Sequence, residues 1–358
     1  MDVVIRADAS VQLGSGHVMR CLTLAHALKQ EGARVTFVSR HIPTALERAV
    51  SKDFGLHGFK VADGREDSEA DALETIQYLS YRGKPGWMVI DNYSIGLDWE
   101  QQIRPHVQRI MVIDDLANRV HDCDVLLDQN LYPNFETRYA ALVPSHARTL
   151  LGPKYALLRP EFYEARSHLR ARDGKIRSVL ISFGGSDPSN ETAKALQAIL
   201  LLTYSTITLD VILGGTNPQV EAVFGLCSKR ARVRLHRDVS NMAELMATAD
   251  LAIGAPGTTA WERCILGLPA ITINLAPNQN LVGESLSAVG ATVNLGWHSE
   301  VTPARIAEAV TQLCENPQRV RAMSQSALRI MRDNNVLARR QILGAILNWE
   351  DFGHGQSI

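Results

Sequence analysis

The sequence lacks the marks of several large classes of protein. Its five cysteines are dispersed and form no C-x-x-C pair, a distribution typical of reduced thiols rather than of a disulfide framework. Its eleven histidines form no H-x-x-x-H or H-E-x-x-H motif, so we expect no dedicated metal site. No apolar run approaches the roughly 20 residues that cross a bilayer, and the opening residues have the pattern of a strand rather than of a signal peptide. We therefore expect a cytoplasmic protein without stable membrane association.

An excess of charge of either sign is also missing. The chain carries 37 Lys and Arg against 38 Asp and Glu, with a sequence pI near 6.8. This balance offers no basic surface for a nucleic acid or an anionic membrane, which leaves a small molecule as the expected partner. A hydrophobic fraction of 46% favours compact folding, and 358 residues exceed one ordinary core. Two α/β domains are the natural expectation.

The stretch near the start predicts a strand, a glycine turn and a helix. An apolar run of strand length opens the chain, Gly14 and Gly16 follow, and apolar residues then recur at helical spacing from Val18 until Gly32. Glycines in such a turn let backbone N–H groups approach a ligand closely. The positive end of the helix favours an anion or developing negative charge at the same place. We therefore expect Gly14 and Gly16 in a ligand site.

His17 is placed at the mouth of this helix, where a second positive charge is disfavoured. A neutral imidazole can take a proton from water or a hydroxyl, so His17 is a candidate general base. The alternative is a half-exposed histidine hydrogen-bonded to a nearby carbonyl. Asp8 ends the strand at the same loop and could orient His17 or accept from a ligand hydroxyl, and Arg20 lies one helical turn beyond His17. Either of these two could instead be a surface ion-pair partner.

A dinucleotide-binding fingerprint fits this stretch poorly. The position of its third glycine holds Met19, and the second predicted strand, residues 34–39, is followed by Arg40 rather than by an acid that would bind a ribose. NAD is therefore disfavoured. Arg40 could still meet the 2′-phosphate of NADP, which leaves that cofactor as a minor alternative. Our expectation is that the protein uses no cofactor.

Three further strands of the first half each end in carboxylates or amides. Residues 87–90, 110–113 and 125–127 are the predicted strands, and the polar clusters 91–93, 114–115 and 128–130 follow them. Ligands of open parallel sheets collect beyond the carboxyl ends of strands, so these clusters should line one rim with His17. Alternatively they cap the helices and turns that follow. Tyr93 could hydrogen-bond a sugar there or pack over the strand ends.

The second half repeats the pattern of strand, small-residue loop and helix. A strand over residues 178–183 leads into Gly184, Gly185 and Asp187, which offer backbone N–H groups to an anion, and Ser189 or Asn190 is a plausible N-cap of the next helix.

A second loop of this kind follows residues 250–254. Gly257, Thr258 and Thr259 would place N–H groups and hydroxyls at a helix start that suits a diphosphate. Glu262, four residues after Thr258, could accept from both hydroxyls of a ribose, or pair with Arg263 or another neighbour. Asn278 and Gln279 could contact a nucleotide or sugar, or act only as caps.

These patterns predict four segments. Residues 1–155 form the first domain, residues 156–177 a proline-broken, charged connection, and residues 178–335 the second domain. Residues 336–358 form a last helix, and a final helix of this kind often packs back across a domain boundary, here onto the N-terminal domain.

An ordered series of motifs resembles one enzyme family over essentially the whole chain. The motifs are residues 5–10, 14–21, 91–93, 114–117, 127–131, 151–159, 182–187 and 261–263. In this order they are similar to the UDP-2,4-diacetamido-2,4,6-trideoxy-β-L-altropyranose hydrolases of pseudaminic acid biosynthesis. Those enzymes themselves resemble the two-domain GT-B glycosyltransferases, especially the N-acetylglucosaminyltransferase that forms lipid II. The resemblance implies an α/β fold with two Rossmann-like domains in a GT-B arrangement and a cleft between them.

The resemblance also implies the chemistry. The second half would hold UDP, with Glu262 on the ribose and the helix start after Gly257 at the diphosphate, and the first half would present the sugar to His17 as base for a water molecule. Pro256 and Asn92 depart from the residues usual in the family, so any role for position 92 is open. A glycosyltransferase using a UDP-amino sugar is the main rival, and a UDP-sugar sensor without catalysis is a third hypothesis.

Overall fold

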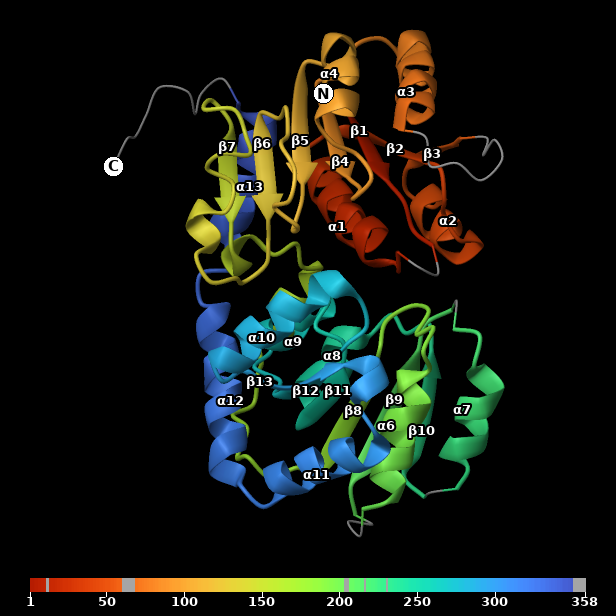
Figure 1. The fold of residues 1–358 in the computed structure, drawn as a ribbon, viewed down its shortest axis with the longest axis vertical. Helices are drawn as coiled ribbons and strands as arrows, with labels where there is room; N and C mark the ends of the chain where they lie inside the picture. Colours follow the sequence, from red (N-terminus) through yellow and green to blue (C-terminus); the bar gives the residue numbers. More distant parts are fainter. Residues whose placement is uncertain (11–12, 60–67, 203–205, 216, 230, 350–358) are drawn as a thin grey trace. The chain divides into compact units, whose positions relative to one another are not determined.

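The chain divides into two compact units (Figure 1). The computed structural model describes all residues except 11–12, 60–67, 203–205, 216, 230 and 350–358. Unit 1 comprises Met1–Asn130, Asn134–Leu157 and Asn334–Ile358, and unit 2 comprises Leu131–Pro133 and Leu158–Asp333. Each unit is built on a parallel sheet, as expected for two Rossmann-like α/β units.

The sheet of unit 1 has seven strands among the described residues, in the order β3-β2-β1-β4-β5-β6-β7. The strands are β1 (Asp2–Ala7), β2 (Arg34–Ser39), β3 (Gly55–Gly58), β4 (Trp87–Asp91), β5 (Arg109–Ile113), β6 (Val125–Asp128) and β7 (Arg148–Leu151). The helices are α1 (Gly16–Gln30), α2 (Thr44–Ser51), α3 (Ser68–Arg82), α4 (Leu97–Ile103) and α13 (Val336–Leu347), with 3-10 turns η1 (Arg104–His106), η2 (Phe135–Thr137) and η3 (Pro153–Tyr155).

Alternation along these strands divides the core of unit 1 into two layers. Val3 and Ile5 of β1 pack with α1, whereas Val4, between them, packs with α3 and α4 on the other face. Both faces are therefore covered, which explains why the strands are nearly continuous apolar runs.

Helix α13 belongs to the core of unit 1 although it ends the described chain. Its residues Ala338, Ile342 and Ile346 lie in the same apolar cluster as α1. Just before it, the buried Asn334 amide donates to three carbonyls of the η3 segment, those of Pro153, Lys154 and Ala156, at 3.0–3.1 Å. The returning chain is thus fixed to the segment at which it left the unit.

The sheet of unit 2 has six strands among the described residues, in the order β10-β9-β8-β11-β12-β13. They are β8 (Ser178–Ser182), β9 (Thr208–Leu213), β10 (Val233–Arg237), β11 (Leu251–Gly254), β12 (Ala270–Asn274) and β13 (Thr292–Trp297). The helices are α5 (Pro160–Ser167), α6 (Glu191–Leu200), α7 (Val220–Cys227), α8 (Met242–Thr248), α9 (Thr259–Ile265), α10 (Asn280–Ala288), α11 (Pro303–Cys314) and α12 (Pro317–Ile330), with 3-10 turns η4 (Pro277–Gln279) and η5 (His298–Glu300).

The segment expected to connect the two domains differs from that expectation, because residues 158–177 form part of unit 2. Phe162 of α5 is fully buried. The buried guanidinium of Arg172 donates to carbonyls at the ends of two helices, including Ala249 at 3.1 Å and Leu266 at 2.6 Å. Helix C-termini leave unpaired carbonyls, so a cation inserted between two of them integrates the segment into the unit.

Strand order places one switch point in each sheet. In unit 1 the order reverses between β1 and β4, and in unit 2 it reverses between β8 and β11. Ala7 pairs with Asp91 and Ser182 with Gly254, so the loops after each pair start side by side. Ligands of open α/β sheets bind at the carboxyl ends of strands at such points.

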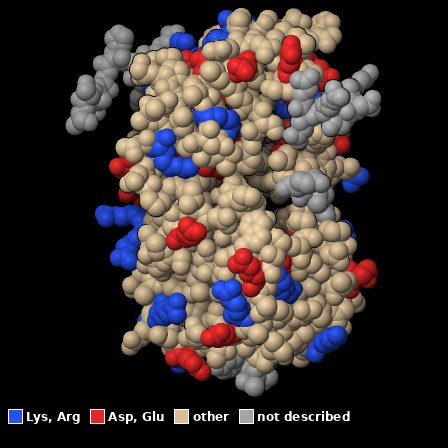
Figure 2. All heavy atoms as spheres, viewed as in Figure 1, with Lys and Arg blue, Asp and Glu red and all other residues tan. Residues whose placement is uncertain are grey.

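Charges of both signs are interspersed on the face drawn in Figure 2. The described part of the chain contains no helix that combines the length and the apolar character needed to cross a membrane.

Candidate functional site

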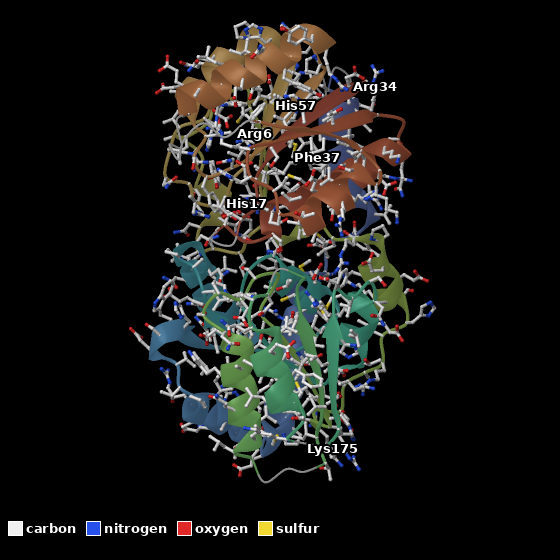
Figure 3. The ribbon with its side chains drawn as sticks, turned by 90° about the vertical axis from the view of Figure 1, so that its right-hand side faces the viewer. Arg6, His17, Arg34, Phe37, His57 and Lys175 are labelled. Atoms are coloured by element: carbon white, nitrogen blue, oxygen red, sulfur yellow. The ribbon has the colours of Figure 1, made fainter. Side chains whose placement is uncertain are left out.

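His17 lies at the switch point of unit 1, in the second residue of α1. Gly14 precedes it with a φ of +75°, a conformation that a side chain would strain, and its N–H donates to the carbonyl of Ser10 at 2.8 Å. His17 is only 7% exposed, so the alternative of a half-exposed histidine does not hold. Figure 3 shows it at the end of unit 1 away from Arg34, which opens β2.

The partner of the His17 ring is Asp91, the last residue of β4. Nδ1 of His17 lies 2.5 Å from Oδ1 of Asp91, a carboxylate with no exposed surface. A carboxylate only accepts, so Nδ1 must be the donor in this pair; Arg20 Nη2 lies 3.2 Å from Nδ1 but donates to Oδ1 of Asp91 at 2.6 Å. We therefore assign the proton to Nδ1, donating to Asp91, which leaves the lone pair of Nε2 as a proton acceptor.

Arg20 fixes the carboxylate that orients His17. Its Nε and Nη2 donate to the two oxygens of Asp91 at 2.6 Å each, and Nη1 donates to Asp115 at 3.2 Å. Burial alone would raise the pKa of Asp91, but Arg20 and His17 outweigh burial and hold that pKa well below its usual range. Arg20 is thus paired with two buried carboxylates rather than exposed as a surface ion-pair partner.

Tyr93 closes the other side of the histidine. Its ring meets the His17 ring edge-on with centroids 4.5 Å apart, and its hydroxyl donates to Asp115 at 2.7 Å. Burial, with Asp115 adding to it, raises the pKa of this hydroxyl, so it remains a donor. The arrangement favours Tyr93 as a packed support for His17 over the role of free sugar ligand.

Asp8 does not orient His17, which corrects one of the two roles considered for it. Its Oδ1 accepts from the backbone N–H groups of Arg40 and His41 at 2.7 and 3.0 Å, and Arg6 lies 2.7 Å away. Its Oδ2 accepts from Asn92 at 2.8 Å. Asp8 therefore joins the loop after β1 to the loop after β2. Its carboxylate oxygens are already bonded to these donors rather than to the ring of His17.

Arg40, the residue considered for a 2′-phosphate, is committed to carboxylates. Its Nε donates to Asp71 at 3.2 Å, and Nη2 lies 3.6 Å from Glu74. This pairing speaks against the NADP alternative.

Beyond β5 and β6 the predicted carboxylate rim forms a buried network. Tyr139 donates to Asp114 at 2.9 Å, and Arg138 pairs with Asp128 at 3.0 Å. Burial, reinforced by the charge of Asp115, raises the pKa of Asp128 to about 7.

In unit 2 the loop after β8 depends on its glycines for its backbone path. Gly184 has a φ of +87°, and a Cβ on Gly214 would lie 2.4 Å from the Cα of Gly185, so the loops after β8 and β9 touch backbone to backbone. Asp187 caps α6, accepting from the N–H groups of Glu191 and Thr192 at 2.8 and 3.0 Å. Asn190 occupies the N-cap position, one of the two expected for it, but its backbone is left-handed and its side chain makes no cap bond, so Asp187 rather than Ser189 or Asn190 supplies the capping oxygens.

Gly257, Thr258 and Thr259 lie half-buried at the start of α9. Glu262, one turn further on, pairs with Arg159 through Oε1 at 3.1 Å. The neighbour considered as its partner, Arg263, instead donates to the carbonyl of Ala255 at 2.7 Å.

The amides of η4 complete this corner of unit 2. Gln279 accepts from the N–H of Leu275 at 2.8 Å, and a Cβ on Gly257 would lie 3.5 Å from its Nε2. Asn278 is half-buried in the same turn. Gln279 therefore lies against the loop that opens α9.

Sequence reasoning missed two residues of these arrangements. Asp91 was placed on the rim but not recognised as the partner of His17; its signal is that it ends the strand next to β1. Arg159, which lies in the motif 151–159, was not predicted as the partner of Glu262. Among the described residues no cluster of three or more His, Cys, Asp or Glu is arranged to hold a metal ion.

Comparison with known proteins shows what this chain is similar to. Residues 179–337 match the glycosyltransferase family 28 C-terminal domain. An uncharacterized protein of Methanocaldococcus jannaschii is 31% identical over 284 residues, covering 76% of this chain but only 55% of that protein, so the chain spans about half the length of this relative. The UDP-2,4-diacetamido-2,4,6-trideoxy-β-L-altropyranose hydrolase of Campylobacter jejuni is 26% identical over 294 residues, covering 82% of this chain and 98% of that enzyme.

A solved structure establishes the fold. The crystal structure of MurG from Acinetobacter baumannii superposes with a TM-score of 0.65 at 18% identity, covering 97% of this chain and 99% of that one. The expected GT-B fold is confirmed.

Proposed function

We propose, from the premise that this is a GT-B protein whose second unit belongs to the glycosyltransferase family 28 C-terminal domains, that it hydrolyses a nucleotide sugar. The substrate would be UDP-2,4-diacetamido-2,4,6-trideoxy-β-L-altropyranose, and water would attack its anomeric carbon. The observation that carries the proposal is the buried pair of His17 and Asp91, which leaves Nε2 of His17 as a base. The Campylobacter jejuni relative, matched over 98% of its length, supports the choice of substrate.

The residues of unit 1 take distinct parts. His17 is the base, and Gly14 and Gly16 shape the loop that presents it. Asp8, Arg20 and Tyr93, which were expected to bind substrate, act chiefly by holding this loop and the ring of His17, because their polar atoms bond to protein groups.

The residues of unit 2 would hold UDP. Glu262 accepts from the ribose, and the N–H groups and hydroxyls of Gly257, Thr258 and Thr259 meet the diphosphate. Gly184 and Gly185 line the loop at the switch point, Asp187 fixes that loop to α6, and Asn278 and Gln279 border the α9 start. Helix α9 has only seven residues, so hydrogen bonds rather than its dipole would supply the binding.

The reaction balances with one base. The water oxygen bonds to the anomeric carbon as its proton passes to Nε2 of His17, and the bond from that carbon to the phosphate oxygen breaks with its electron pair leaving on UDP. A diphosphate held by hydrogen bonds is a good leaving group and needs no strong general acid. A single histidine therefore suffices, without the paired carboxylates of ordinary glycosidases, and attack from the opposite face inverts the anomeric centre.

A glycosyltransferase acting on a UDP-amino sugar is the second candidate. The family of the second unit and the MurG-like fold favour it. His17 would then take the proton of an acceptor hydroxyl instead of water.

The deciding experiment incubates the protein with the UDP-altrose derivative in oxygen-18 water and weighs the products by mass spectrometry. Label in the free sugar is expected. Label in UDP would mean attack on phosphorus and would overturn the mechanism, and no cleavage without an acceptor would move the assignment to a transferase or, if no acceptor is ever used, to a sensor. The matched variant His17→Asn should bind UDP within about twofold of the wild type and lose turnover; equal loss of both would remove His17 as the base.

A further inference from the structure

Arg159 is held in unit 2 by three neighbours. Its Nη1 lies 2.8 Å from Glu161, its Nη2 donates to Glu262 at 3.1 Å, and its guanidinium carbon lies 5.1 Å from the ring centre of Phe162. Phe162 is fully buried and so gives the guanidinium a fixed surface to pack on. Arg159 stands immediately before α5, whereas Glu262 is in α9, so this ion pair joins two helices.

The two carboxylate oxygens of Glu262 differ in their contacts. Its side chain is 16% exposed, and only Oε1 is bonded to Arg159. Within the described part of the chain no group donates a hydrogen bond to Oε2. One oxygen is therefore fixed while the other remains an acceptor, which is the state a hydroxyl-bearing ligand needs.

We propose that Arg159 is a positioning residue for nucleotide recognition: by holding Oε1 of Glu262 it aims Oε2 at the ribose hydroxyls and gives the site its preference for a ribonucleotide. This inference rests on the proposed binding of UDP by unit 2. Arg159 does not touch the ribose; it acts through the geometry and charge of Glu262. A bonded, ionised carboxylate accepts more strongly than a neutral one, and a fixed one loses less freedom on binding.

The charges around Glu262 give the proposal a pH signature. Burial raises the pKa of Glu262 and Arg159 opposes that rise; Glu161 faces it from α5 and raises it, and Arg263 of α9 lowers it. Without Arg159 the carboxyl would bind a proton at higher pH. Ribose binding should then weaken as pH falls, starting at a higher pH than in the wild type.

The test is calorimetric titration of the full chain with UDP and with 2′-deoxy-UDP. Arg159→Met should weaken UDP binding by about 10- to 100-fold, the loss expected for a charge-assisted hydrogen bond, and bring the two affinities together. In steady state KM for the UDP-sugar should rise while kcat stays within about twofold. Raising the pH from 6 to 8 should recover part of the lost affinity.

Glu161→Gln is the matched control, because it removes the other carboxylate on Arg159 and keeps the hydrogen bond from Arg159 to Glu262; losing the charge of Glu161 lowers the pKa of Glu262, so Glu262 stays ionised. Its ratio of UDP to 2′-deoxy-UDP affinity should match the wild type, and Arg159→Lys should restore part of the preference. If the methionine variant does not fold, Arg159→Gln repeats the test with a neutral donor. A methionine or glutamine variant that keeps the wild-type ratio overturns the proposal, as does a wild type that binds both nucleotides equally. A wild type that binds no UDP overturns the proposed function itself.

Discussion

The Nδ1 atom of His17 and the Oδ1 atom of Asp91 lie 2.5 Å apart, and Arg20 bonds to both oxygens of the same carboxylate. One buried aspartate thus sets the direction of the histidine ring and is itself locked by a bidentate cation. The proton on Nδ1 of His17 is therefore fixed by Asp91 before any substrate binds.

Asp91→Asn should lower kcat by about 10²- to 10⁴-fold while UDP binding stays near wild type, because an amide N–H facing Nδ1 favours the tautomer with its proton on Nε2. Rapid-quench assays beside UDP titrations measure this. The variant also leaves Arg20 short of a partner, at a cost of about 3–5 kcal/mol of unfolding free energy, so its folding must be checked. Cys21→Ser is the control. Sγ of Cys21 donates to Oδ2 of Asp91 at 3.4 Å, the oxygen that does not bond to His17, so this variant should keep its activity.

Tyr93→Phe should change kcat less than about threefold and leave KM unchanged, because the ring beside His17 remains while the hydrogen bond to Asp115 is lost. Tyr93→Ala should lower kcat roughly tenfold by removing the edge-on ring contact. A phenylalanine variant with raised KM and normal kcat would instead return the hydroxyl to the role of sugar ligand.

Asp187→Ala should destabilise unit 2 by about 1–2 kcal/mol in urea unfolding, since both oxygens cap α6. UDP affinity should change by less than about threefold. Asp187→Asn, which keeps one acceptor, should lose less stability. A tenfold loss of UDP affinity at unchanged stability would identify Asp187 as a ligand contact and contradict its role as a cap.

Asp128 gives unit 1 a pH-dependent stability. Because its folded pKa, about 7, lies above its unfolded value, its contribution is complete at low pH and is lost as pH rises through 7. Wild-type unfolding free energy should therefore fall by roughly 1–4 kcal/mol from this residue between pH 5.5 and 8. Asp128→Asn, a neutral mimic that loses the pairing with Arg138 at both pH values, should flatten that slope. Equal slopes in urea titrations of the two proteins would refute this assignment.

The sequence predicts where the two candidate sites lie, but it does not predict which side chains bond to one another within them. The strand ends at Ala7 and Asp91, and the loops at Gly14 and Gly184, were predictable because apolar runs and glycines act locally. The sequence did not predict which carboxylate bonds to His17, because Asp91 ends β4 and Asp8 directly follows the adjacent strand β1. The two differ in their other partners, since Asp8 accepts from Arg40, His41 and Asn92. The edge strand β3 was not predicted because it has only four residues and most of them are exposed, which leaves no apolar run.

Residues 158–177 were misplaced for a related reason. Their prolines and arginines have the pattern of an exposed linker. Arg172 is nevertheless buried and donates to carbonyl groups far along the chain, which no local sequence pattern predicts. Long-range partners of this kind are decided only once the helices of unit 2 are packed.

The bonds from Asn334 to the carbonyls of Pro153, Lys154 and Ala156 bring together the places where the chain leaves and rejoins unit 1. Most of unit 2 is therefore a long excursion between two adjacent positions of unit 1. Helix α13 fills part of the core of unit 1, so residues 1–157 emerge from the ribosome with that core still open. Unit 2 is the part of the polypeptide that can be completed first during synthesis, and unit 1 must wait until residues 334–347 have been made.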